Sequence, residues 1–281
     1  MMRDWGSDFF GQLNDLPKEP LNIIASVLEA MRTQRTFRLA RRELIADLRG
    51  LIMSPGGEVK ILEAGCGTGA SLPDIAELIP SASLYGVDYT RHFIELAKER
   101  ARSLGFSRAT YVQGDIRSLD VLDGAFNAAF CDKLLLHVGP PEVVAGAMAR
   151  AVKSGGLVGA IEWYPNFLLS TSKPSYLASF NEIFRKAVYN INAAANLERI
   201  LRSAGLSIVG SKTYVAEAKS LDEEAFWRSF IVDQAPLFIH AGLISEAEAR
   251  EIIRDIEEIN KRGEFHGSFM VRSSIGMKKP I

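Results

Sequence analysis

The sequence predicts an α/β protein built on a doubly wound, seven-stranded, mostly parallel sheet of the Rossmann-like kind, with a reversed last strand and a helical cap. Two observations predict it. Strand-like and helix-like segments alternate through the middle of the chain, which is the pattern of a parallel sheet with crossover helices. The first of these strands runs directly into three glycines on alternate positions, Gly65, Gly67 and Gly69. The chain has 281 residues, of which 47% are hydrophobic and 24% charged, and this suits one large domain with a sizeable cap.

The first half of the chain divides into a helical segment and an alternating core. Residues 1–50 are expected to be mostly helical and to form an N-terminal lid, because Phe37, Ala40 and Leu44 recur at helical spacing. Residues 51–165 are expected to form the core. Its strands are predicted at 59–64, 83–88, 110–114, 126–132 and 156–162, and its helices at about 70–79, 90–104 and 140–153.

Residues 166–281 are expected to supply the helical cap insertions and the last two strands of the same sheet. Helical stretches are predicted at 175–204, 222–239 and 245–261, and strands at 206–215 and 268–276. Since helices separate these two strands, they are expected to join the sheet as an antiparallel addition. The cap would then cover the carboxyl edge, where open α/β sheets bind ligands.

The glycine turn between Gly65 and Gly69 is the strongest functional signal. Glycines at a strand-to-helix turn let the backbone turn sharply and let a ligand approach it closely. An acidic residue about 20 positions further on usually holds a ribose hydroxyl pair, and Asp88 ends the second predicted strand. This pattern alone leaves a nicotinamide cofactor and S-adenosylmethionine both open.

Two further carboxylates favour S-adenosylmethionine. Glu63 lies two residues before the first glycine, and Asp115 follows the third predicted strand. A dinucleotide places its pyrophosphate at the helix N-terminus, where a nearby carboxylate would repel it. S-adenosylmethionine has no phosphate and carries an ammonium and a sulfonium group, so acidic neighbours are favourable. Asp115 could also accept a hydrogen bond from an adenine amino group.

The segment Glu63–Gly69 resembles the first motif of the class I S-adenosylmethionine-dependent methyltransferases. Val87-Asp88 resembles their second motif, residues 114–116 the third and residues 130–132 the fourth. The resemblance covers roughly residues 58–163. Within the class, residues 192–206 are similar to small-molecule methyltransferases of the ubiquinone/menaquinone-biosynthesis type.

The resemblance implies a set of cofactor-binding residues. The methionine moiety would lie near the first motif, the ribose on Asp88 with Tyr89 against the adenine, and the adenine amino group on Asp115. The implied set is Glu63, Gly65, Cys66, Gly67, Gly69, Asp88, Tyr89, Asp115, Ile116 and Cys131. Cys66 and Cys131 fit no metal-ligand spacing, and neither is expected to be a nucleophile.

Methyl transfer from a sulfonium is an in-line displacement, so positioning of the acceptor supplies much of the acceleration. His137, after the fourth strand, is the candidate base, with a packing role as the alternative. The candidate substrate contacts are Asp132, Lys133, Glu162 and Trp163. Aromatic residues around Phe226 and Phe230 are expected to pack in the core, but any that line the pocket would favour an apolar or aromatic acceptor.

Composition restricts the partners. A net charge of −1 gives no reason to expect nucleic acid, and no run of about 18 apolar residues predicts membrane insertion. The first residues lack the apolar core of a secretion signal, so a cytoplasmic protein is expected. The resemblance implies a small-molecule acceptor. A protein substrate and a homodimer remain open. One helix face carries Arg35, Arg38, Arg42 and Arg49 and is either solvated or binds an anionic substrate group or an acidic membrane surface.

Overall fold

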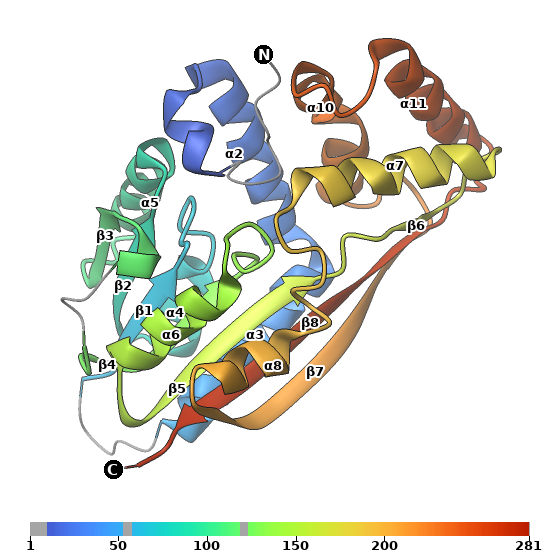
Figure 1. Ribbon diagram of the computed structural model, residues 1–281. Helices are drawn as coiled ribbons and strands as arrows, with labels where there is room; N and C mark the ends of the chain where they lie inside the picture. Colours follow the sequence, from blue (N-terminus) through green and yellow to red (C-terminus); the bar gives the residue numbers. More distant parts are fainter. Residues whose placement is uncertain (1–9, 53–57, 119–122, 281) are drawn as a thin grey trace.

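The computed structural model describes residues 10–52, 58–118 and 123–280 and contains one mixed sheet (Figure 1). Its strands are β1 (Lys60–Ala64), β2 (Ser83–Asp88), β3 (Ala109–Gln113), β4 (Phe126–Asp132), β5 (Val152–Trp163), β6 (Leu168–Leu169), β7 (Leu206–Ala218) and β8 (Gly267–Lys278). The order is β3-β2-β1-β4-β5-β8-β6, with β7 on the other side of β8. β1 to β5 are parallel, and β8 runs antiparallel to β5, β6 and β7. The predicted fold class is confirmed, although over the described residues the sheet has 8 strands rather than seven because β6 is added.

The helices cover the sheet and cap one of its edges. They are η1 (Phe10–Asp15), α2 (Lys18–Thr33), α3 (Arg35–Leu51), α4 (Leu72–Leu78), α5 (Arg91–Ser103), η2 (Ile116–Ser118), α6 (Pro141–Ala151), α7 (Pro174–Ala187), α8 (Leu197–Ser203), α9 (Ala225–Arg228), η4 (Ser229–Asp233), α10 (Ala235–His240) and α11 (Glu246–Lys261). The helix predicted at 222–239 is therefore three short pieces, with a π-helical turn, η4, in the middle. Pro236 in the first turn of α10 cannot donate a backbone hydrogen bond, so one regular helix cannot run through it.

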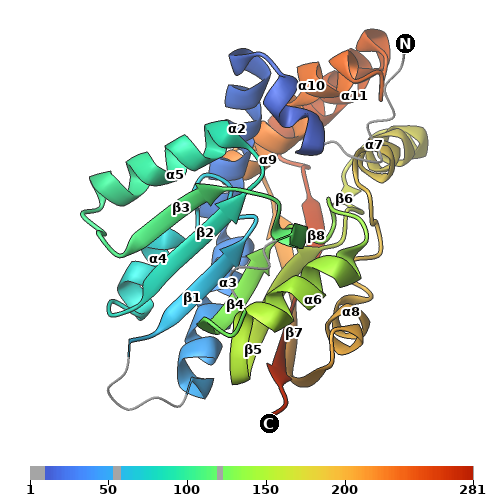
Figure 2. The ribbon, with the colours of Figure 1, turned by 60° about the vertical axis from the view of Figure 1, so that its left-hand side comes forward.

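Helices lie on both faces of the sheet. α3 packs against β5, β7 and β8 on one face, whereas α6 packs against β1, β4 and β5 on the other (Figure 2). Phe37, Ala40 and Leu44 of α3 are buried, as the helical spacing predicts. A Cβ atom at Gly159 of β5 would lie 3.0 Å from the Leu44 side chain, so α3 contacts the sheet closely.

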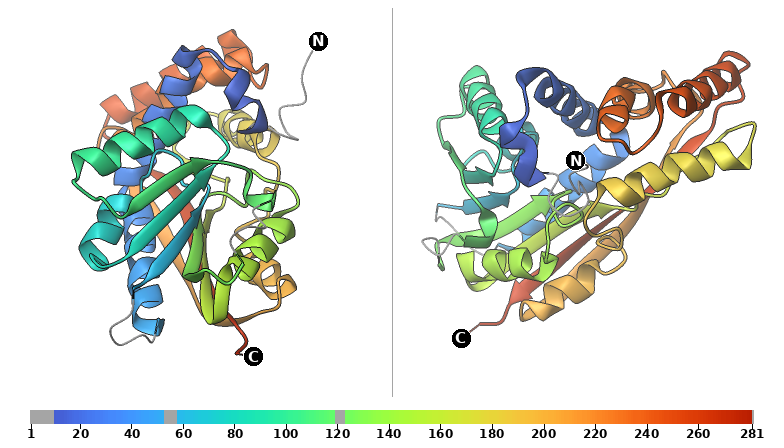
Figure 3. Two further views of the ribbon diagram at one scale, coloured as in Figure 1. Left: turned by 90° about the vertical axis from the view of Figure 1, so that its left-hand side faces the viewer. Right: turned by 45° about the horizontal axis from the view of Figure 1, so that its top comes forward.

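The strands β7 and β8 extend past the end of β5 and support the cap. β7 pairs with β8 along its whole length, whereas β5 reaches only to Val271 of β8, and β6 pairs with the remaining Gly267 and Ser268. The helices α2, α7, α10 and α11 gather at this end of the molecule, beyond the carboxyl ends of the parallel strands (Figures 1 and 3). The division of the chain into lid, core and cap segments remains a prediction.

An aromatic cluster fastens the cap to the sheet. Phe230 of η4 stacks on Phe184 of α7 with ring centroids 4.9 Å apart, and on Phe226 of α9 at the same distance. Trp163 at the end of β5 packs edge-on against Phe230, and Phe269 of β8 packs against Phe226. The aromatic residues of the cap are mainly core, as expected. No described helix combines the length and the apolar character that a membrane span needs.

Candidate cofactor and acceptor site

The glycine turn after β1 has a backbone that only glycine adopts easily. Gly65, Gly67 and Gly69 have φ values of 67°, 51° and 73°, all in the left-handed region. A Cβ atom at Gly65 would lie 2.7 Å from the side chain of Leu134, in the loop after β4. The turn therefore lies against the fourth strand's loop, and its backbone forms one wall of a cleft.

Asp88 at the end of β2 is bonded to this turn. Its Oδ2 accepts the backbone N–H of Gly67 at 2.8 Å, and its Oδ1 accepts the N–H of Thr90 at 2.8 Å. Burial raises the pKa of Asp88, while these two N–H donors act in the opposite direction. Since an ionised carboxylate offers about four acceptor positions, about two remain for the hydroxyls of a ligand.

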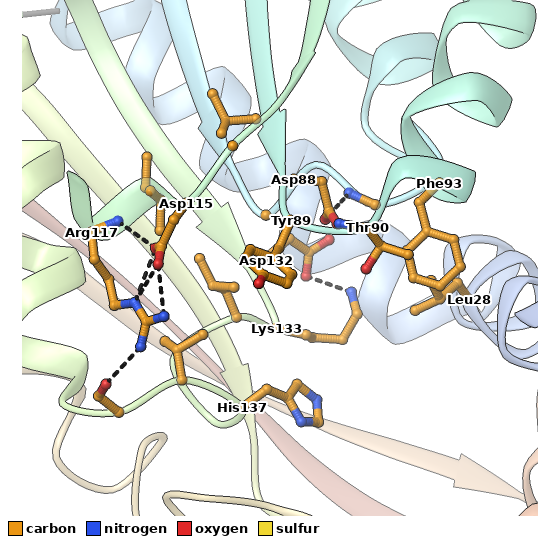
Figure 4. Close-up of a pocket in the computed structure, with 18 of the residues that line it drawn as sticks. Leu28, Asp88, Tyr89, Thr90, Phe93, Asp115, Arg117, Asp132, Lys133 and His137 are labelled. Carbon is orange, nitrogen blue, oxygen red and sulfur yellow. Dashed lines mark hydrogen bonds and ion pairs between the residues drawn. The ribbon is translucent and has the colours of Figure 1, made fainter. Parts of the chain in front are cut away.

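A cleft of about 150 Å³ lies at the carboxyl ends of β1, β2 and β4 (Figure 4). Its wall includes Gly65, Gly67, Asp88, Tyr89, Asp115, Ile116, Asp132, Lys133 and His137, all of them predicted site residues. Thr90, Phe93 and Arg117 also line it, as do Leu28 and Met31 of α2, none of which the sequence singled out. The side chains from α2 could not be predicted, because no local spacing shows that this helix crosses the cleft.

Asp115 does not face the cleft as a free carboxylate. Arg117 forms an ion pair with it at 2.7 Å and also donates to the carbonyl of Gly139 at 3.3 Å. This guanidinium lowers the pKa of Asp115. An adenine amino group would therefore share the Asp115 carboxylate with Arg117.

Four predicted cofactor residues, Glu63, Cys66, Gly69 and Cys131, lie behind the cleft wall rather than on it. Glu63 is buried, and its Oε2 accepts the hydroxyl of Ser71 at 2.6 Å. Burial raises the pKa of Glu63 to about 8, so at neutral pH it is mostly uncharged. It therefore supports the turn from behind, through its bond to Ser71, and its contact with a cofactor remains a prediction. Burial also raises the thiol pKa of Cys66 and Cys131, which argues against nucleophilic roles.

A buried ionic network joins α3 to the end of the cleft that Asp132 and Lys133 line. Arg41, 1% exposed, donates to Asp74 of α4 at 2.7 Å and to Asp132 at the end of β4 at 3.4 Å. Asp132 also accepts the ammonium of Lys133 at 2.5 Å. Lys133 has a left-handed backbone, φ 62°, and its ammonium lies 4.7 Å from the ring centroid of Phe37. The adjacent pair Asp132–Lys133 is thus one end of a fixed network.

The arginine face of α3 is occupied by acidic side chains of the same chain. Arg42 pairs with Glu77 at 2.6 Å, Arg38 approaches Asp74 at 3.8 Å, and Arg35 approaches Glu224 at 3.3 Å. These partners come from α4 and from the segment before α9. Arg35 and Arg38 nevertheless stay largely exposed, so the face is both partly paired and partly solvated.

A second, apolar cavity of about 120 Å³ adjoins the cleft. Its wall is Ile24, Val27, Leu28, Met31, His137, Trp163, Phe184, Ala187, Val188, Phe230, Gln234, Leu237, Phe238, Ala241 and Leu243. Three residues, Leu28, Met31 and His137, line both spaces and mark where they meet. Burial, assisted by the charge of Lys133, lowers the pKa of His137 to about 3, so its imidazole is neutral.

The two residues predicted at the end of β5 have different positions. Trp163 lies on the wall of the apolar cavity, and its contact with a substrate remains a prediction. Glu162 lies outside that wall and is fully buried, and its Oε1 accepts the backbone N–H of Leu135 at 2.6 Å. It therefore holds the loop between β4 and α6, which carries Lys133 and His137. Burial raises the pKa of Glu162 to about 8.

The fold, the glycine turn and the acidic strand ends together define a class I S-adenosylmethionine-dependent methyltransferase. Residues 61–156 match the family described as a methyltransferase domain, so the chain carries a domain of that family and its cofactor is S-adenosylmethionine. The resemblance inferred from the motifs is confirmed. The match ends at the start of the apolar part of β5, so it does not include the cap.

Named proteins of this kind are similar to the chain. It is 22% identical over 259 residues to 24-methylenesterol C-methyltransferase 2 of Oryza sativa subsp. japonica, covering 89% of this chain and 70% of that protein. It is 30% identical over 126 residues to demethylmenaquinone methyltransferase of Anoxybacillus flavithermus, covering 44% of this chain and 49% of that protein. The chain thus spans about half the length of the second relative.

A solved structure shows the same fold over nearly the whole chain. The [4+2]-cyclase SpnF has a TM-score of 0.61 at 18% sequence identity, and the superposition covers 98% of both chains. At this identity the likeness describes the fold alone. The cap as well as the core therefore has a counterpart among known structures.

Proposed function

We propose that the protein transfers a methyl group from S-adenosylmethionine to a small, apolar or aromatic acceptor by in-line displacement. The observation that carries this proposal is the meeting of a polar cleft and an apolar cavity at Leu28, Met31 and His137. When bound, S-adenosylmethionine supplies an electrophilic methyl group on a sulfonium. A cofactor in the cleft and an acceptor in the cavity would face each other across this junction.

The charges of the cleft support this cofactor. The cleft wall carries three carboxylates, those of Asp88, Asp115 and Asp132. It carries two cationic groups, those of Arg117 and Lys133, so negative charge is in excess. This balance favours a ligand with a positive charge and disfavours a pyrophosphate. In the proposal Asp88 holds the ribose hydroxyls, and Asp115 with the backbone of Ile116 holds the adenine.

The cavity and the relatives support an apolar acceptor. The named relatives methylate a sterol and a demethylmenaquinone, which are both largely apolar molecules. The cavity wall is made mostly of aliphatic and aromatic side chains. Its small volume and apolar wall suit a small molecule better than a protein side chain, which would have to arrive on an extended segment. A cytoplasmic location and a homodimeric state remain predictions from the sequence.

In the proposal His137 orients the acceptor at the junction. A neutral imidazole accepts a hydrogen bond from the O–H or N–H of an acceptor, but a pKa of about 3 makes it a weak base. Glu162 would position His137 indirectly, through its hydrogen bond to Leu135 in the same loop. Burial of these groups also suits a reaction in which the charge of the sulfonium is lost.

The test is a transfer assay with cofactor labelled in the methyl group. Phenols, quinols and sterols are each tested as acceptors in separate assays. A further assay uses a mixture of denatured proteins and tests for a protein substrate. We expect label in at least one apolar compound and a lower rate with His137→Asn, while the affinity for S-adenosylhomocysteine stays within about twofold. Binding of S-adenosylhomocysteine without label in any arm would contradict methyl transfer. The protein would then use this fold for another reaction, and the [4+2]-cyclase SpnF is a neighbour with the same fold.

A further inference from the structure

We infer that Gln234 and Trp163 form a polar end of the apolar cavity and bind a hydroxyl group of the acceptor. This inference rests on the proposed function, because it concerns the acceptor of the same site. Gln234 lines the apolar cavity but not the cofactor cleft, whereas His137 lines both. The recognised hydroxyl therefore lies away from the atom that receives the methyl group.

Gln234 has an unused hydrogen-bond acceptor in an apolar wall. The residue is 6% exposed, and its side-chain amide donates to the carbonyl of Phe230. Within the described part of the chain, no group donates to its amide oxygen. Since this NH2 group is held by Phe230, the oxygen is left for a donor in the cavity.

The local backbone explains why Gln234 reaches the cavity. Its N–H donates to the carbonyl of Ser229 at 3.2 Å, an i to i+5 bond that belongs to the π-helical turn η4. Such single turns inside helical segments are rare and are frequently found at functional sites. The same turn places Phe230 on the cavity wall.

Trp163 contributes the complementary donor. Its indole Nε1 is buried, and none of the described residues accepts a hydrogen bond from it. Trp163 packs edge-on against Phe230 at 5.5 Å between centroids, and Gln234 bonds the carbonyl of Phe230. The unused donor and the unused acceptor thus border the same residue. A buried donor without a partner is unfavourable, and an oxygen atom from a ligand would remove that cost.

A hydroxyl group satisfies both residues at once. Its hydrogen donates to the Gln234 oxygen, and its oxygen accepts the Trp163 N–H. A hydrocarbon would satisfy neither residue, and a carboxylate would offer no hydrogen to the Gln234 oxygen. Among the residues that the structure describes, no Lys or Arg lines this cavity to balance such a charge. A cavity of about 150 Å³ is known to hold benzene, so the 120 Å³ here suits one ring-sized unit.

The test compares phenol with benzene. Both are titrated by NMR into the protein saturated with S-adenosylhomocysteine, which keeps the probes out of the cofactor cleft. We expect tighter binding of phenol to the unchanged protein. We expect the ratio of phenol to benzene affinity to fall about tenfold in Gln234→Met and severalfold in Trp163→Phe, which keeps an aromatic ring. Val188→Ala, on the same wall, is the control and should change both affinities by a similar factor.

Three results would overturn the inference. The first is equal affinity of the unchanged protein for phenol and benzene. The second is that phenol does not bind at concentrations up to its solubility. The third is that the ratio of phenol to benzene affinity is the same in both variants as in the unchanged protein. Benzene binding shows that each variant is folded, and Trp163→Phe keeps the test open if Gln234→Met is unstable. Saturation with S-adenosylhomocysteine is observed separately. A failure of S-adenosylhomocysteine to saturate the protein would contradict the proposed cofactor. A phenol affinity no greater than the benzene affinity would contradict only the inference about the acceptor.

Discussion

The backbone N–H of Gly67 donates to Oδ2 of Asp88 at 2.8 Å, so the glycine turn after β1 and the end of β2 form one bonded unit. The sequence predicts both features separately, as a close approach to a ligand and as an acceptor for ribose hydroxyls. The structure adds that Asp88 also fixes the turn. A change at Asp88 therefore acts on the cofactor site in two ways.

We predict that Asp88→Ala weakens the binding of S-adenosylhomocysteine by at least about tenfold, or ~1.4 kcal/mol. The variant loses the acceptors proposed for the ribose and also the bond that holds Gly67. Isothermal titration calorimetry measures the effect. Asp47→Ala is the matched control, because Asp47 pairs with Lys212 away from the cleft. An unchanged affinity in Asp88→Ala would remove Asp88 from the cofactor site.

We predict that Arg41→Met destabilises the fold by about 3–5 kcal/mol, because buried Asp74 loses its shortest ion pair and Asp132 is left with Lys133 as its cation. Arg38→Met is the control, since Arg38 is largely exposed and lies 3.8 Å from the same Asp74. We expect it to cost less than about 1 kcal/mol. Urea unfolding of both variants measures the difference. Equal free energies of unfolding would show that the Arg41 network does not hold α3 in place.

We predict that Glu162→Gln gains stability relative to the unchanged protein as the pH rises from about 5 to 8. Burial raises the pKa of Glu162 from 4.5 to about 8, so the folded state holds a proton that the unfolded state has lost. In the unchanged protein, the part of the free energy of unfolding that comes from this protonated carboxyl is fully present below pH 4.5. It is lost as the pH rises through 8. The expected relative gain is at most about 1.4 kcal/mol per pH unit.

The glutamine keeps an oxygen to accept the N–H of Leu135, so the loop before His137 should stay in place. Unfolding is measured in urea at several pH values. Glu77→Gln serves as the exposed control, because Glu77 pairs with Arg42 at the surface. If the difference in free energy of unfolding between Glu162→Gln and the unchanged protein did not change with pH over this range, Glu162 would not be a buried acid.

We propose that the N-terminal helical segment acts as a lid, and we predict that Asn14→Ala speeds the release of S-adenosylhomocysteine about fivefold. The side chain of Asn14 in η1 donates to the carbonyl of Tyr89 at 2.9 Å and accepts the N–H of Arg91 at 3.0 Å. These bonds hold η1 on the loop after β2, beside the cleft. Each contributes about 1 kcal/mol to the stability of this docked position. Stopped-flow displacement measures the rate.

Asn127→Ala is the control for this experiment, because Asn127 also accepts a backbone N–H, that of Lys60, but at the opposite end of β1. An unaltered release rate in Asn14→Ala would show that η1 need not move for the cofactor to leave.

The parts of the site that were predicted from the sequence lie on short local motifs. The turn at Gly65–Gly69 and the carboxylate of Asp88 follow from a strand-to-helix pattern that can be read within a few residues. The charge state of Glu63 could not be predicted in this way, because it depends on burial by elements distant in the sequence. Motif position placed Glu63 correctly on β1 but did not show that it lies behind the wall.

The apolar cavity was less predictable, because its walls come from five separate parts of the chain. Leu28 and Met31 come from α2, Trp163 from β5 and Gln234 from the end of η4. Helical spacing predicts a continuous helix through Gln234, and only the π-helical turn, set by packing, brings this residue to the cavity. In α3 the spacing of the arginines indicated the exposed face as a candidate site. The buried Arg41 instead forms the ionic network with Asp74 and Asp132.

The most direct test of the central claim is a calorimetric titration of the unchanged protein with S-adenosylhomocysteine, NAD and NADP under identical conditions. The negatively charged cleft around Asp88 predicts saturable binding of S-adenosylhomocysteine at one site per chain and no binding of either nicotinamide cofactor. Saturable binding of NAD or NADP with none of S-adenosylhomocysteine would contradict the assignment of this cleft to a methyl-donor cofactor.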